Sequence, residues 1–143
     1  MWFPIPDGSR CGSECNSSSV TGPLVYFPPG KYMVSSSIEA MYNTPLVGDS
    51  TDPSTILAAR SFVFLSVISS DVYIDGGNGA EWYINQNNFL RQVRNFIIDI
   101  RQAMVEHPAG LHWQVAQASP NILDEIKMGS HQVVSEGLWK PAA

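Results

Sequence analysis

Hydrophobic positions in this chain fall in short runs separated by turn residues. The runs are Leu24–Phe27, Lys31–Val34, Leu46–Gly48, Thr55–Ala58 and Phe62–Ile68. Clusters rich in Pro, Gly, Asp and Ser, such as Pro28-Pro29-Gly30 and residues 48–53, lie between them. Prolines remove ladder donors and glycines permit turns, so such punctuation predicts strands of a few residues each. Residues 38–41 have no clear pattern.

The segment 89–100 has two interpretations. Phe89, Val93, Phe96 and Ile100 recur at helical spacing. Phe96, Ile98 and Ile100 also alternate with their neighbours, which is strand spacing. Because β-branched and aromatic residues dominate, we predict a strand at Val93–Ile100.

The rest of the pattern extends the same fold class. Gly110–Ala118 is predicted as a strand, and Asp75–Gly79 as a flexible loop. Many short strands without a long helix predict an all-β protein, and pattern alone leaves a sandwich and a solenoid open. We divide the chain into an N-terminal loop (1–23), a β domain (24–119) and a tail (120–143), in which residues 122–127 fit a helical turn or a frayed strand.

Charge excludes some function classes. Charged residues make up 15% of the chain, against roughly 25% in ordinary soluble domains. The net charge is −5 and no Lys/Arg cluster exists, so a nucleic-acid partner is not expected. No apolar stretch reaches membrane-spanning length, so no membrane partner is expected either. Uncharged polar residues suit a neutral sugar ligand, and they also suit secreted β proteins in general.

The two cysteines, Cys11 and Cys15, fit either a small disulfide loop or two free thiols. Two cysteines are too few for a structural zinc site. The first residues, Met1-Trp2-Phe3-Pro4, lack the pattern of a signal peptide. We therefore expect either a protein that is not secreted or a chain whose true N-terminus has been lost.

Glycoside hydrolysis needs two carboxylates beside the scissile bond. No Asp-Asp or Glu-x-Asp pair is visible along the sequence, so no catalytic residue is assigned. The scattered histidines give no metal-ligand spacing, and neither a metal nor a cofactor is expected. The candidate carboxylates are Asp71, Asp75, Glu81, Asp99, Glu106, Glu125 and Glu136.

The segment His112–Ala118 carries the most unusual residues. In a regular strand Trp113, Val115 and Gln117 share the inner face, and His112 and Gln114 face outward. An outward amide donates and accepts hydrogen bonds, which suits sugar hydroxyls or an attacking water. The alternative is a polar ladder that only stabilises neighbouring strands.

A second polar stretch, at residues 81–88, suggests similar chemistry. Trp82 is either a core residue or a platform for a sugar ring, and Gln86 is a further candidate for sugar binding.

These residues carry a resemblance to a known family. Val25–Tyr32 resembles the opening coil of pectate-lyase-like β-helix proteins. Asn78–Phe89, Arg91–Ile100 and His112–Ala118 are similar to the fungal exo-β-1,3-glucanases of glycoside hydrolase family 55. The resemblance covers Arg10–Ser119 and implies a partial right-handed parallel β-helix.

The resemblance also implies a function. Its members are secreted, have two tandem β-helices, and release glucose from β-1,3-glucan by inverting hydrolysis. The general-acid glutamate belongs to the second β-helix, and the first supplies glutamines that bind sugar or position water. Gln86 and Gln114 match these glutamines, Gln117 matches less well, and Cys11 and Cys15 match a paired-cysteine loop.

Two departures limit what the resemblance implies. The segment that precedes the loop in the family is absent, and the match stops after Ser119. We therefore expect a truncated fragment of a glucan exo-1,3-β-glucosidase that is inactive alone. The alternatives are a non-catalytic glucan-binding or structural β-helix piece and a pectin-acting β-helix enzyme.

Overall fold

A computed structural model describes residues 24–81, 88–105, 108–116 and 121–129. These ranges form strands joined by turns. The strands are β1 (Val25–Phe27), β2 (Lys31–Val34), β3 (Ile38–Glu39), β4 (Leu46–Gly48), β5 (Ser54–Ala58), β6 (Ser66–Ser69), β7 (Val93–Asp99), β8 (Ala109–His112) and β9 (Asn121–Lys127). Within the described part, no helix is long and apolar enough to cross a membrane.

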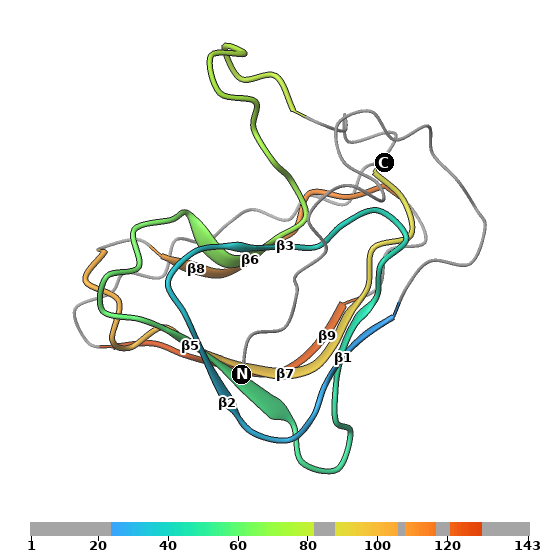
Figure 1. The fold of residues 1–143 in the computed structure, drawn as a ribbon, viewed down its shortest axis with the longest axis vertical. Helices are drawn as coiled ribbons and strands as arrows, with labels where there is room; N and C mark the ends of the chain where they lie inside the picture. Colours follow the sequence, from blue (N-terminus) through green and yellow to red (C-terminus); the bar gives the residue numbers. More distant parts are fainter. Residues whose placement is uncertain (1–23, 82–87, 106–107, 117–120, 130–143) are drawn as a thin grey trace.

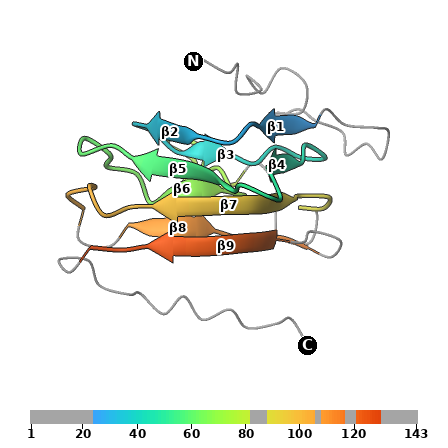
Figure 2. The same cartoon turned by 90° about the horizontal axis from the view of Figure 1, so that it is seen from below.

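The strands stack as successive coils of one winding chain (Figures 1 and 2). One sheet has the order β1-β4-β7-β5-β2, with β9 also paired to β7, and the other has the order β3-β6-β8. Every ladder between these strands is parallel. Parallel neighbours need long connections between them, and here the rest of each coil supplies the connection. The all-β, partial parallel β-helix fold is therefore confirmed, and the sandwich is excluded.

Strand β7 turns a corner without leaving the sheet. Its first residues pair with β4 and its last with β5, and the register shifts between them. Asn95 lies at the shift with a φ of 60°, a left-handed conformation that asparagine tolerates better than most residues. Val93 and Phe96 both point inward because this bend interrupts the alternation. The helical spacing of Val93 and Phe96 is thus a corner in a strand, and the predicted strand is confirmed.

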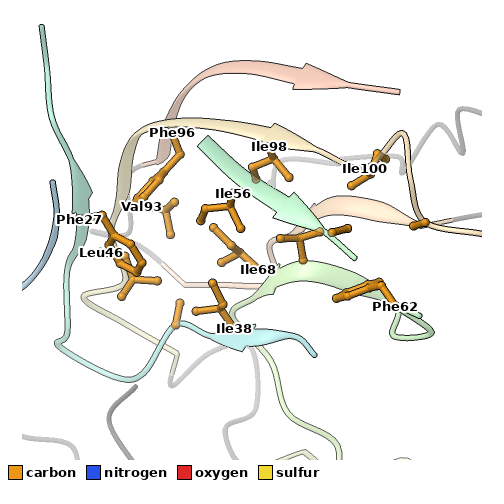
Figure 3. Close-up of a cluster of buried hydrophobic side chains, with 14 residues drawn as sticks. Phe27, Ile38, Leu46, Ile56, Phe62, Ile68, Val93, Phe96, Ile98 and Ile100 are labelled. Carbon is orange, nitrogen blue, oxygen red and sulfur yellow. The ribbon is translucent and has the colours of Figure 1, made fainter. Parts of the chain in front are cut away.

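Ladders of apolar side chains fill the space between the two sheets (Figure 3). The register aligns Tyr32, Ile56, Ile98 and Ile126 on consecutive coils. Ile56 and Ile98 are fully buried. Burying a side chain of this size contributes about 1.5–3 kcal/mol. On the opposite sheet Ile38, Ile68 and Leu111 form a second ladder.

Two strand boundaries differ from the sequence-based ones. The strand predicted at Phe62–Ile68 begins only at Ser66, because the Phe62 amide donates to the Ala59 carbonyl in a turn at 2.9 Å. Val63, Phe64 and Leu65 then lie exposed in the connection. At the other end of the chain, Asn121–Lys127 is a strand that continues the sheet beyond residue 119. How residues 120–143 relate to the family stays a prediction.

Candidate functional site

A hairpin leaves the β-helix directly after β6. Tyr73 and Glu81 pair across it in an isolated antiparallel bridge, and the Ile74 amide donates to the Ala80 carbonyl at 2.8 Å. Gly76 and Gly79 turn its tip with φ of 73° and 89°, which glycine adopts without steric penalty. The predicted loop at Asp75–Gly79 is confirmed. Figure 1 shows this green segment extending away from β6.

The segment that follows β8 is held by side chains. We predicted a strand to Ala118, but β8 ends at His112. The backbone N–H of Gln114 donates to Ser70 Oγ at 2.8 Å, and the backbone carbonyl of Gln114 accepts from Asn88 Nδ2 at 2.6 Å. The Ala116 amide donates to the Asn88 carbonyl at 3.0 Å. The strand stops because Ser70 and Asn88 replace the ladder bonds of a neighbouring strand.

Asn88 is itself fixed on both sides of its amide. Its nitrogen also donates to the Ser70 carbonyl at 3.1 Å, and its oxygen accepts from Arg91 Nε at 2.7 Å. Asn88 is fully buried and Arg91 is 3% exposed. A buried amide with satisfied donors and acceptor is a rigid support. The backbone at Gln114 therefore has a defined position.

Trp113 and Gln114 follow the predicted faces, and His112 contacts the preceding coil. Trp113 packs against the core. Gln114 instead reaches the hairpin, where its Nε2 donates to Glu81 Oε1 at 3.0 Å. His112 Nδ1 lies 3.3 Å from Ser69 Oγ on the preceding coil. The outward orientation of Gln114 and the inward orientation of Trp113 are therefore confirmed.

Asp71 brings a second carboxylate to Glu81. Asp71 begins the hairpin and is only 6% exposed, and its backbone is held by Ser69 Oγ. Among the described residues, its Oδ2 has no hydrogen-bond partner. Burial raises the pKa of the Asp71 carboxyl, the charge of Glu81 raises it further, and His112 opposes the shift. Burial, Asp71 and Glu81 also raise the pKa of Tyr73.

The site that results is a cluster of Asp71, Tyr73, Glu81, His112 and Gln114, called here the hairpin cluster. It joins two carboxyl groups, a phenol, an imidazole and a side-chain amide where the hairpin meets the β-helix. This set offers both acceptors and donors to hydroxyl groups. Within the described ranges, no three His, Cys, Asp or Glu residues are placed to hold a metal ion.

The structure sorts the remaining sequence-based candidates. Asp99 is a structural charge, because Arg101 Nη2 donates to its Oδ2 at 2.6 Å. Glu125 lies 3.4 Å from Lys127, and Asp75 is exposed at the hairpin tip. The candidates that lie outside the described residues are Trp82, Gln86, Glu106, Gln117, Glu136, Cys11 and Cys15.

Sequence reasoning missed the pairing of Asp71 with Glu81 and the support by Ser70, Asn88 and Arg91. The two carboxylates are distant in sequence and meet only because the hairpin folds back on itself. The glycine-rich tip was the available signal, since a loop of this kind returns the chain beside its own start.

Comparison with known proteins identifies the family of this chain. Residues 7–135 match the model of the family described as "Rhamnogalacturonase A/epimerase, pectate lyase-like". The chain belongs to this pectate-lyase-like family. The match covers most of the chain, including every strand of the β-helix described above.

Among the curated relatives of this chain are proteins named as 1,3-β-glucosidases. A "Probable glucan endo-1,3-beta-glucosidase" of Arthroderma benhamiae is 50% identical over 87% of this chain, and a "Glucan 1,3-beta-glucosidase" of Cochliobolus carbonum is 38% identical over 80%. The "Non-secreted LysM effector LysM15" of Penicillium expansum is 53% identical over 80%. The predicted resemblance to fungal β-1,3-glucanases is confirmed. The pectate-lyase-like chain spans 14%, 15% and 8% of the length of these relatives, respectively.

Proposed function

We propose that this chain contributes a β-1,3-glucan-binding wall to a glucan-hydrolysing protein, and that the hairpin cluster contacts the sugar. The observation that carries the proposal is the Gln114–Glu81 hydrogen bond beside the buried Asp71, at a fixed point of the β-helix. Neutral sugars are recognised by acceptors and donors of this kind, and two relatives are named for action on 1,3-β-glucan.

The proposal also states that the isolated chain does not hydrolyse glucan. By resemblance, the general acid belongs to a second β-helix, and the wall described here would bind substrate and position water without it. The buried Asp71 and its neighbour Glu81 supply the competing possibility, since a paired acid and base is the minimum for glycoside hydrolysis. Laminarin incubation followed by glucose measurement separates the two. We expect no glucose release, and release that Asp71→Asn abolishes would establish hydrolysis by the chain itself.

Binding is tested with Gln114→Ala. Retention on insoluble β-1,3-glucan and calorimetry with laminari-oligosaccharides should show binding by the unaltered chain. Loss of one net hydrogen bond of about 1 kcal/mol should weaken the affinity about fivefold. Glu125→Gln on β9 is the matched control and should bind normally. Absence of binding by the unaltered chain, or equal affinity for the Gln114 variant, would contradict the proposal.

A pectin-acting enzyme is the second candidate, because the matching family model is described by rhamnogalacturonase and epimerase. Polygalacturonate and rhamnogalacturonan belong in the same calorimetric series. Tighter binding of either polymer than of laminari-oligosaccharides would favour this candidate over the glucan proposal.

A further inference from the structure

The hydrogen bond between Glu81 and Gln114 determines the orientation of the side-chain amide of Gln114. A carboxylate only accepts hydrogen bonds, so the group that faces Glu81 Oε1 at 3.0 Å must be the amide nitrogen. The side-chain oxygen of Gln114, Oε1, then lies on the other side of the amide group. If the amide were flipped, two oxygens would face each other and the pattern of donor and acceptor offered to a ligand would be reversed.

The hairpin places Asp71 beside the same carboxylate. Tyr73 and Glu81 are bridge partners, so their side chains lie on one face of the hairpin. Asp71 is two residues before Tyr73, and its carboxyl interacts with both Glu81 and Tyr73. Its buried Oδ2 has no partner among the described residues. Two carboxylates close together, one of them removed from water, cannot both ionise without strong repulsion.

We propose that Glu81 is a positioning residue that fixes the orientation of the Gln114 side-chain amide, and that its neighbour, the buried Asp71, makes this orientation depend on whether Asp71 is ionised. While Asp71 is protonated, its hydroxyl supplies a donor for Glu81 and Glu81 still accepts from Gln114. When Asp71 ionises, the two charges repel and Glu81 is displaced. The consequence for glucan affinity rests on the proposed function, whereas the orientation of Gln114 does not.

The groups that face Asp71 set the direction of the effect. Glu81 and Tyr73 lie on the hairpin, and His112 lies on β8. Burial and Glu81 raise the pKa of Asp71, and a positive charge on His112 lowers it. The orientation of the Gln114 side-chain amide should therefore be fixed while Asp71 is protonated and loosen as the pH rises through the ionisation of Asp71.

The first test follows the side-chain amide of Gln114 by NMR. Its two proton resonances, assigned by their loss in Gln114→Ala, should shift with pH in the unaltered chain. Glu81→Ala should remove the shift, because the acceptor is gone. Asp71→Asn should keep the hydrogen-bonded position of the resonances and abolish the titration. Glu125→Gln should leave the titration unchanged. Resonances that ignore both pH and Glu81→Ala would overturn the proposal.

The second test measures affinity for laminari-oligosaccharides across the same pH range. Glu81→Ala should lose about as much affinity as Gln114→Ala. Glu81→Gln, which keeps the shape but allows either amide orientation, should bind with intermediate affinity and without pH dependence. Circular dichroism verifies that each variant is folded. Normal, pH-dependent binding by Glu81→Gln would overturn the positioning role while the glucan proposal stood. If the NMR titration were observed but the chain bound no glucan, the positioning role of Glu81 would stand and the glucan proposal would be overturned.

Discussion

Three aspartates show how local contacts decide the behaviour of one residue type. Asp49 accepts hydrogen bonds from Thr51 and from Tyr26, which hold the pKa of its carboxyl well below the ordinary value. Arg101 lowers the pKa of Asp99 in the same way. Asp71 accepts from the Val72 backbone and lies near His112, but burial is the largest effect and, together with the charge of Glu81, raises its pKa. Of the three, Asp71 is the one whose ionisation opposes folding.

This contrast predicts a pH-dependent gain in stability from Asp71→Asn. The folded carboxyl keeps its proton to higher pH than the unfolded one, so its stabilising contribution is full below about 3.8 and is lost as the pH rises through the folded pKa. The amide has no such loss. We therefore expect the difference in the free energy of unfolding, variant minus unaltered chain, to grow in favour of the variant as the pH rises.

Urea unfolding at several pH values between 4 and 7 measures this difference. Asp49 and Asp99 contribute equally to both chains, so they cancel. Asp75→Asn makes the same charge change at the exposed hairpin tip and serves as the control. A difference for Asp71→Asn that is flat with pH, or that favours the unaltered chain at pH 7, would show that Asp71 does not carry an unfavourable buried charge.

At the scale of elements, the corners of the β-helix were the hardest feature to predict. The strand β7 followed from its alternation, because inward and outward residues differ in hydrophobicity. The extra bend at Asn95 leaves only one displaced residue in that pattern. The bonds from Ser70 and Asn88 to the Gln114 backbone leave no periodic signal at all. Periodicity therefore predicted the strands and the outward direction of Gln114, and tertiary contacts determined the rest.

The close approach of Asn95 favours glycine at position 48, at the end of β4. Asn95 Nδ2 donates to the Gly48 carbonyl at 3.1 Å, so the two coils approach closely there. A Cβ on Gly48 would lie 2.0 Å from the backbone oxygen of Asn95. Because that oxygen belongs to the backbone, relief requires the coils to separate. Gly48→Ala should lower the free energy of unfolding by about 1–3 kcal/mol or more.

Gly110→Ala is the matched control for Gly48→Ala. Its Cβ would meet Ile126 Cγ2 at 3.0 Å and Cδ1 at 3.1 Å, which are side-chain atoms and not backbone. Ile126 is 43% exposed, so its side chain has room to shift. We expect a loss of about 1 kcal/mol or less. Equal losses for the two variants in urea unfolding would mean that the Gly48–Asn95 approach is not a rigid contact.

At the scale of the whole molecule, stability accumulates along the axis of stacked coils. Each strand of β4, β5, β6 and β7 has neighbours on both sides, whereas β9 lies at one end of the described stack (Figure 2). Contacts in such a winding are mainly between adjacent coils. A residue in the middle of a ladder is therefore covered from two directions, and a residue in the last described coil from one.

The ladder of Ile56, Ile98 and Ile126 turns this into a measurable gradient. Ile98 is fully buried between its neighbours, so Ile98→Ala should cost about 2–5 kcal/mol. Ile126 occupies the equivalent inward position on β9 and is 43% exposed, so Ile126→Ala should cost about 1 kcal/mol. The same methyl groups are removed from the same ladder in both variants, and only the coverage by adjacent coils differs. If urea unfolding of the 143-residue chain gave equal losses, an additional layer would have to cover Ile126 in solution, and the gradient would be wrong.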